Sequence, residues 1–149
     1  MLYAFRKIDI DAKKGEDTTA LHQAAARGHS TAVKLLLKAK ADVNVNSYSG
    51  TALHMAAMNG HEAVVKLLLE AKADVNVKSN DGSTPLHWGM PLYWVAKKRS
   101  EAVVKLLLEA KADVNAKDND GWTALDWAPG TGMGQWLSCC KLGIHGYCD

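Results

Sequence analysis

The clearest hydrophobic and polar pattern in the chain is an amphipathic segment that occurs twice without change and once in modified form. Residues 62–76 and 101–115 both read Glu-Ala-Val-Val-Lys-Leu-Leu-Leu-Glu-Ala-Lys-Ala-Asp-Val-Asn, and residues 32–44 form a near copy. The valines and leucines follow the i, i+3, i+4 spacing of a helix with one buried stripe, whereas the charged residues fall four apart on the other face. The pattern therefore predicts a helix that recurs along the chain and packs against its own copies.

A second, shorter apolar helix is predicted ahead of each copy. Its threonine suits an N-cap, and Pro85 suits the first helical position. Asp81-Gly82 and Asp120-Gly121 signal tight hairpin turns between the units. Each unit thus reads as hairpin, helix, turn, helix, and it is stable only when stacked, because neither short helix would persist alone. The helix openings are Thr19-Ala20-Leu21-His22, Thr51-Ala52-Leu53-His54, Thr84-Pro85-Leu86-His87 and Thr123-Ala124-Leu125-Asp126.

The combined motif resembles the ankyrin repeat over roughly Asp9 to Ala128. It contains Asp-Gly-x-Thr-Pro-Leu-His, Ala-Ala-x-x-Gly-His, Val-x-x-Leu-Leu and Ala-Asp-Val-Asn in order. The resemblance implies an all-α solenoid of helix-turn-helix units with short β-hairpins projecting as fingers, and a concave face that holds another protein. We expect the array to span residues 1–128, with about three full units and partial first and last units, followed by a non-repeat tail at 129–149.

The chain departs from the family pattern at the end of each longer helix. Lys40, Lys72 and Lys111 stand where the family usually has glycine, at a position that commonly adopts a left-handed conformation. A lysine in that conformation costs about 1 kcal/mol or more. The second unit is also one residue shorter, between Gly50 and Thr51. We therefore predict left-handed lysines at three equivalent places.

The third unit contains a six-residue duplication. Residues 84–89 and 90–95 both resemble a helix opening, and so two registers compete for one place in the stack. The first register would put Pro91 inside the helix, at a cost of about 3 kcal/mol, whereas losing Thr84 as a cap costs only about 1 kcal/mol. We therefore expect the second copy to form the helix and residues 84–89 to enlarge the finger.

Composition narrows the compartment and the partner class. The net charge is +2, and the basic residues are interspersed, which does not indicate nucleic-acid binding. Apolar runs fall well short of the roughly 18 residues of a membrane span, and so no membrane association is predicted. All three cysteines lie in the last eleven residues, which favours a reducing, cytoplasmic location. Because ankyrin-like proteins also include secreted effectors of intracellular bacteria, the chain does not choose between these locations.

No catalytic site or cofactor is predicted, and an enzyme is not expected. His22, His54 and His87 occupy equivalent positions in units whose helices pack 8–10 Å apart, too far for one metal, so we interpret them as hydrogen-bonding residues near helix starts. The glycines at 130–134 lack the context of a dinucleotide fingerprint. In the tail, Cys139, Cys140, His145 and Cys148 are zinc-ligand types, but adjacent cysteines do not match the spacing of structural zinc sites.

The preferred hypothesis is a non-catalytic module that binds another protein through its concave and finger-tip face. Tryptophan is enriched among interface anchors, and exposed apolar patches usually mark contacts. Two alternatives remain open: a structural segment of a longer scaffold with end-to-end self-association, or a tail with zinc or redox chemistry. The predicted partner-binding residues are Gln23, Arg27, Tyr48, Met55, Met58, Asn59, Asp81, Trp88, Trp94, Lys97, Lys98, Trp122 and Trp127.

Overall fold

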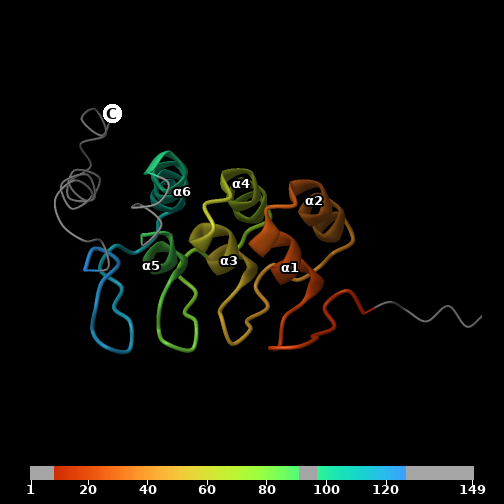
Figure 1. Cartoon of the computed structure of the whole chain (residues 1–149), viewed down its shortest axis with the longest axis horizontal. Helices are drawn as coiled ribbons and strands as arrows, with labels where there is room; N and C mark the ends of the chain where they lie inside the picture. The colour runs from red at the N-terminus through yellow and green to blue at the C-terminus, as the bar shows by residue number, and fades with distance from the viewer. Residues whose placement is uncertain (1–8, 91–96, 127–149) are drawn as a thin grey trace, which may run out of the picture.

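The computed structural model describes residues 9–90 and 97–126, with the side chains of residues 97–100 excepted. Within that part, the helices form two rows that run along the molecule, and loops project beside one row as fingers (Figure 1). The helices are α1 (Ala20–Arg27), α2 (Ser30–Lys38), α3 (Ala52–Met58), α4 (Glu62–Glu70), α5 (Pro85–Gly89) and α6 (Lys97–Glu109).

The two rows arise because each unit folds into a helix pair and each pair leans on the next. α1, α3 and α5 lie beside the fingers, and α2, α4 and α6 form the outer row (Figure 1). Contacts join α1 to α2 and α3 to α4 within units, and α1 to α3 and α2 to α4 between units. This confirms the predicted helix-turn-helix solenoid.

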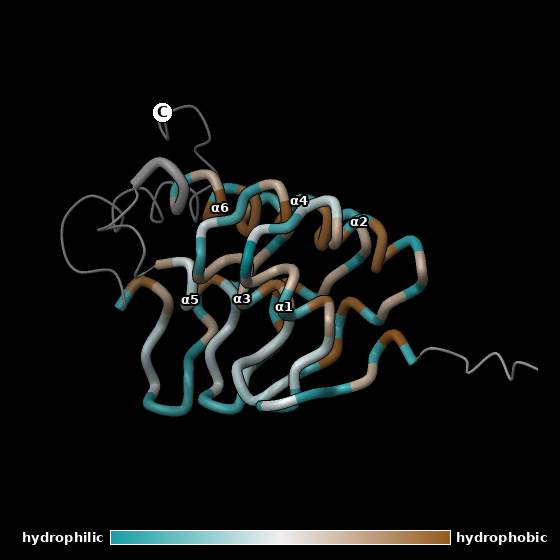
Figure 2. The backbone as a smooth tube through the Cα atoms, turned by 45° about the vertical axis from the view of Figure 1, so that its right-hand side comes forward, coloured by the Kyte–Doolittle hydropathy of each residue, from teal (hydrophilic) through white to brown (hydrophobic). Residues whose placement is uncertain are grey.

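The apolar stripes of the helices make one continuous core. Val65, Leu68, Val104 and Leu107 each have 0% of their surface exposed, as does Leu53 from the inner row. Hydrophobic residues concentrate on the helices, whereas hydrophilic residues occupy the finger ends (Figure 2). The hydrophobic effect therefore acts mainly between units, which explains how helices of five to thirteen residues persist.

The ends of the outer helices confirm the prediction of left-handed lysines. Lys40, Lys72 and Lys111 have φ angles of 68°, 66° and 69°. At the end of α2, the Lys40 amide donates to Leu37 O and the Ala41 amide donates to Leu36 O, both at 3.0 Å. These two bonds form the Schellman motif that satisfies the last carbonyls of a helix. The same pair of bonds ends α4 and α6.

The fingers are closed by isolated β-bridges, and the described residues contain no regular strand. Bridges join Lys14 to Thr18, Ser47 to Gly50 and Lys117 to Thr123. The second finger is one residue shorter: Gly50 O accepts from Ser47 N at 2.9 Å, where Ser83 O accepts from Ser79 N in the third finger at the same distance. The predicted omission in the second unit is confirmed.

The expected register of the duplicated segment is wrong. The first copy forms α5, with Thr84 as its N-cap and Pro85 at its start, and α5 packs against α3. The third finger is not enlarged, because its closing bond, from Ser79 N to Ser83 O, joins residues four apart in the sequence, as the Asp118 N to Trp122 O bond of the fourth finger does. The helix ends at Gly89, before Pro91, so the proline cost that decided the prediction does not arise. Residues 91–95 of the second copy lie outside the described residues.

Polar side chains bridge successive units below the outer helices. Asn44 Oδ1 accepts from the Asp74 amide at 2.8 Å, and Asn76 Oδ1 accepts from the Asp113 amide at 2.7 Å. Within a unit, Asp74 Oδ1 accepts from the Asn76 amide at 3.0 Å. The Ala-Asp-Val-Asn tetrad therefore serves both its own turn and the next unit.

Candidate interaction surface

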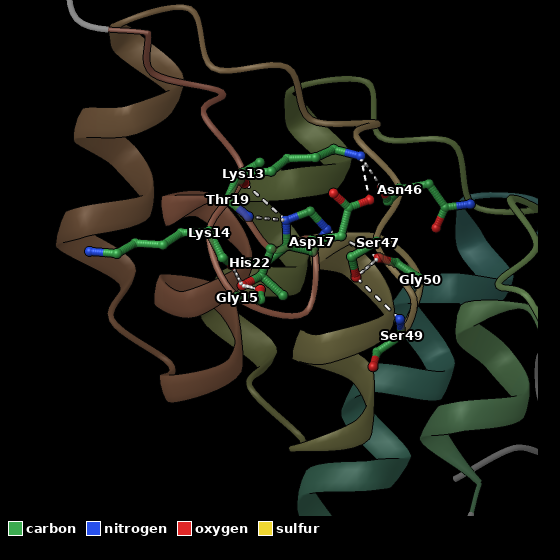
Figure 3. A network of polar contacts seen from close by, with 11 residues as sticks. Lys13, Lys14, Gly15, Asp17, Thr19, His22, Asn46, Ser47, Ser49 and Gly50 are labelled. Atoms are coloured by element: carbon green, nitrogen blue, oxygen red, sulfur yellow. Dashed lines mark hydrogen bonds and ion pairs between the residues drawn. The ribbon is translucent and has the colours of Figure 1, made fainter.

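The three equivalent histidines are structural, as predicted. His22 Nδ1 accepts from the Thr19 amide at 3.2 Å, and in a neutral imidazole this leaves the proton on Nε2. His22 Nε2 then donates to Gly50 O of the next unit at 3.1 Å (Figure 3). Nearby, Lys13 Nζ bonds Asp17 at 2.7 Å and Asn46 O at 3.2 Å. The network joins the first two units.

The same arrangement recurs in the next two units and changes in the last. His54 Nε2 donates to Ser83 O and His87 Nε2 to Trp122 O, each at 2.9 Å. Asp126 replaces the histidine in the fourth unit and accepts from the Thr123 amide at 2.8 Å. This bond with Thr123 lowers the pKa of Asp126. An ionised aspartate has no proton to donate to a following unit.

Burial makes His22 and His54 poor bases. Burial lowers the pKa of His54 to about 4, although the hydrogen bond to the Ser83 carbonyl favours the charged form and acts to raise the pKa. Burial also lowers the pKa of His22. Both side chains are therefore neutral at pH 7 and suited to the hydrogen bonds described above.

The finger turns carry the large exposed aromatic side chains of the described residues. Tyr48 is 70% exposed, and Trp122 is 53% exposed. Asp81 is also exposed, but its Oδ1 accepts from the Ser83 amide at 3.0 Å, so it shapes its own turn. The pKa of Asp81 is lowered, because bonds from Ser79 and Ser83 outweigh the opposing effect of burial. Tyr48 and Trp122 were both predicted as partner-binding residues, and both side chains are accessible to a partner.

Trp122 borders a shallow, acidic hollow of about 400 Å³. Asp118, Asp120 and Asp126 line it together with the indole. Asp118 Oδ1 accepts from the amides of Asp120 and Trp122, both at 2.9 Å, so the carboxylate is held in place by its own turn. The hollow therefore combines an exposed aromatic ring with fixed negative charge.

The inner helices contribute fewer exposed anchors than predicted. Gln23 and Arg27 are exposed on α1, and Met58 is 38% exposed at the end of α3. Asn59 is half-buried, and its Nδ2 donates to Met55 O at 2.9 Å. Met55 is only 8% exposed, so its predicted place on the open face is wrong. It belongs to the hydrophobic core instead.

Trp88 also differs from an open interface anchor. Its ring lies 5.6 Å from the His54 ring in an edge-to-face arrangement, with an interplanar angle of 81°. Its Nε1 is buried and makes no hydrogen bond with the described part of the chain. Trp88 is half-buried because it belongs to α5, which lies in the inner row of helices. The predicted register had instead placed Trp88 in a finger.

Several predicted residues cannot be placed. Trp94 and Trp127, with the cysteines and histidine of the tail, lie outside the described residues, as do the side chains of Lys97 and Lys98. Within residues 9–90 and 97–126, no three histidine, cysteine or acidic side chains converge as metal ligands would. Among the helices described, none has the length and apolarity needed to cross a bilayer.

Two exposed leucines, Leu35 and Leu125, were missed by the sequence reasoning. Leu35 on α2 is 62% exposed, although it stands within the triple-leucine segment that was predicted to be buried. The signal that could have revealed it is its position in the first full unit of the described residues, which begin at Asp9. A leucine stripe is buried only where a neighbouring unit covers it.

Comparison with known families agrees with the repeat architecture. A family model described as ankyrin repeats (3 copies) matches residues 1–79 and 50–90. A second model, ankyrin repeats (many copies), matches residues 92–132. Among curated proteins, no sequence matches the chain.

Proposed function

Because the chain belongs to the ankyrin-repeat family, whose members generally mediate protein–protein interaction, we propose that it binds a partner protein through its finger turns and the exposed side of the inner helices. Ankyrin-repeat domains are typically non-catalytic, and the proposal assigns this chain no reaction. The binding array spans residues 1–128, with residues 129–149 as a non-repeat tail.

The observation that carries the proposal is the pair of exposed aromatic rings at the finger turns. Tyr48 and Trp122 leave 70% and 53% of their surface exposed, and aromatic residues are enriched at protein interfaces. Ser47 Oγ bonds Gly50 O at 2.8 Å and accepts from the Ser49 amide at 3.3 Å, which orders the turn of Tyr48. Turns ordered before binding lose less conformational entropy in a complex.

The charge around the Trp122 ring indicates which side chains of a partner would bind there. The hollow beside Trp122 presents the carboxylates of Asp118, Asp120 and Asp126. A lysine or arginine of the partner would meet both these charges and the face of the indole, a favourable site for a cation. On the inner helices, Gln23, Arg27 and Met58 supply a mixed rim.

The test is a comparison of partner capture by the wild-type chain and by a Tyr48→Ala/Trp122→Ala variant. Captured proteins are identified, and the binding constant is then measured with each purified partner. We expect the variant to bind at least about ten-fold more weakly, because it loses two aromatic anchors. Lys66→Ala, on the outer side of α4, is the matched control and should bind as the wild type does.

Equal affinity of the wild type and the double variant would overturn the proposed surface. Circular dichroism must first show the same helix content for all three proteins. The scaffold alternative makes a different prediction, since self-association would raise the mass measured by light scattering as the concentration increases. A chain that stays monomeric and binds a heterologous partner supports the interaction module.

A further inference from the structure

The first unit exposes a helix face that the following units keep covered. Leu35 on α2 is 62% exposed, whereas its equivalents Leu67 and Leu106 pack partly against the core. On α1, Ala20 is exposed, whereas Ala52 and Ala124 are 1% and 2% exposed. Equivalent side chains thus differ in burial according to whether a helix pair lies before them within the described residues.

This comparison shows toward which end of the stack the open face points. α4 follows α2, and α6 follows α4, with direct contacts in both cases. Positions covered in α4 and α6 but open in α2 therefore face the N-terminal end of the stack, beyond α1 and α2 in Figure 1. The face is shaped to receive a helix, because the same surface receives α2 on α4 and α4 on α6.

The outer stripe of α2 also differs in charge from that of its copies. Ser30, Lys34 and Lys38 stand where α4 has Glu62, Lys66 and Glu70. Lys66 pairs with Glu62 at 3.0 Å, and Lys105 of α6 pairs with Glu101 at 3.8 Å. α2 contains no acidic residue, so its outer stripe carries two positive charges where α4 carries a net negative one.

The other charged groups around the face do not neutralise this stripe. In the first finger, Lys13 and Asp17 pair with each other at 2.7 Å, and Lys14 and Glu16 are of opposite sign. Lys40, just after α2, is exposed, and Asp42 lies two residues later. Asp9 and Asp11 add two carboxylates near that turn, where Asp11 Oδ1 accepts from the Asp42 amide at 3.0 Å. On α2 itself, the charges next to Leu35 are those of Lys34 and Lys38.

We propose that this N-terminal face, defined as the exposed stripe of α2 around Leu35 together with Ala20, docks an amphipathic helix of a partner protein whose apolar side is flanked by acidic residues. The leucine and alanine supply the apolar contact, and Lys34 and Lys38 pair with the flanking carboxylates. The proposal does not depend on the exposed rings of the finger turns, because Tyr48 and Trp122 are not part of this face.

Charge also selects among the possible occupants. A second copy docking through the same face would bring two α2 stripes together, and like charges in an interface disfavour association. The chain's own first residues contain Arg6 and Lys7, which add positive charge. An anionic bilayer would satisfy the lysines, but membrane binding scales with inserted apolar area, and the stripe offers one large apolar side chain.

A hollow next to this face adds room for a side chain. It has a volume of about 510 Å³ and lies between the first finger and α1. Ala12, Thr19, Ala20 and Gln23 are among its lining residues. An apolar side chain from the end of a docked helix would contact Ala12 and Ala20 there.

The experiment uses two peptides whose apolar residues are identical. The acidic probe is Glu-Ala-Val-Val-Glu-Leu-Leu-Leu-Glu-Ala, the sequence of residues 62–71 with Lys66 replaced by Glu, and the basic probe carries lysine at all three charged places. Each is titrated to millimolar concentration into the full-length ¹⁵N-labelled chain, because a single short helix binds weakly. The acidic probe should shift the amides of residues 31–39 and bind at least about ten-fold more tightly than the basic one.

Variants locate the contact. Leu35→Gln and the double variant Lys34→Gln/Lys38→Gln should each lower the affinity for the acidic probe several-fold. Lys66→Gln on α4 should leave that affinity unchanged. Leu35 is already exposed, so its substitution should not unfold the array. Equal affinity for the two peptides, or shifts confined to other helices, would overturn the proposal.

Three further outcomes would assign the face to another occupant and so overturn the proposal. The first is concentration-dependent shifts at residues 31–39 without peptide, which would indicate a second copy. The second is nuclear Overhauser contacts in the free chain between Leu35 and residues 1–8. The third is Leu35-dependent binding to phosphatidylserine vesicles with no binding of the acidic peptide, which would indicate a lipid surface.

Discussion

The imidazole of His54 and the carbonyl of Ser83 join the second unit to the third through a hydrogen bond of 2.9 Å. On its other side, His54 Nδ1 accepts from the Thr51 amide at 3.0 Å. Protonation of Nδ1 would set its proton against the Thr51 amide, so the bond with Thr51 requires a neutral ring. Because burial at the unit interface also disfavours the charged ring, the stability of this interface depends on pH.

We predict that stability falls as the pH falls from 6.5 to 4. Burial lowers the pKa of His54 from 6.5 to about 4, while Asp81 acts to raise it and His87 and His22 act to lower it. Below pH 6.5 the unfolded chain binds a proton at His54 that the folded chain does not bind. The free energy of unfolding therefore decreases as the pH falls below 6.5. The loss from His54 is about 3 kcal/mol, and His22 acts in the same direction.

The measurement is urea unfolding at pH 7 and pH 4.5. A His54→Gln variant should be less stable at pH 7 and should lose less stability on acidification. His29→Gln, which changes an exposed histidine, should retain the wild-type pH dependence. The same pH dependence in His54→Gln as in the wild type would contradict the role assigned to this ring.

Replacing a left-handed lysine with glycine should stabilise the array. Lys72 has a φ of 66°, a conformation that costs a non-glycine residue roughly 1 kcal/mol or more. Lys72→Gly should raise the free energy of unfolding by about 1 kcal/mol and raise the melting temperature by several degrees. The matched control is Lys66→Gly in the middle of α4, which should lower stability by about 1 kcal/mol. An unchanged or lower melting temperature for Lys72→Gly would contradict the strain argument.

Removing one bridging side-chain amide should weaken the contact between the turn that follows α4 and the turn that follows α6. Asn76 accepts from the Asp113 amide at 2.7 Å and donates to Lys111 O at 3.3 Å. Asn76→Ala should cost about 1–2 kcal/mol in urea unfolding, since two polar groups lose a partner. Asn80 is a suitable control, because its backbone carbonyl, not its side chain, accepts from Asn119 Nδ2. Asn80→Ala should therefore cost little. Similar losses in the two variants would argue against the bridging role.

A comparison of two glycines should separate steric clash from backbone strain. A Cβ at Gly28, with φ of 71°, would lie 2.6 Å from His61 Nδ1, whereas one at Gly121, with φ of 83°, would meet nothing within 4 Å. Gly121→Ala should therefore cost about 1 kcal/mol from its dihedral angles alone. Gly28→Ala should cost more, because His61 must also move and its bond with Ala26 O, now 3.1 Å, is put at risk. Thermal unfolding of both variants is the test, and equal losses would show that His61 yields freely.

The repeats, the helix types and the caps could be predicted from the sequence because they depend on local order. Thr51 caps its helix, and Lys72 is left-handed, for reasons contained within a few neighbouring residues. The inward stripe of Val65 and Leu68 follows in the same way from helical periodicity. The exposure of Tyr48 and Trp122 followed from their places at finger turns.

The tertiary structure decided what depends on a neighbouring unit. Local energies favoured the second copy of the duplicated segment, but α5 forms from the first, where His87 reaches Trp122 O and the helix packs on α3. Met55 is buried and Leu35 is exposed for the complementary reason: one has helix pairs on both sides, and the other has none described before it. Sequence periodicity specifies which face of a helix is apolar, but only the packed neighbours determine whether that face is covered.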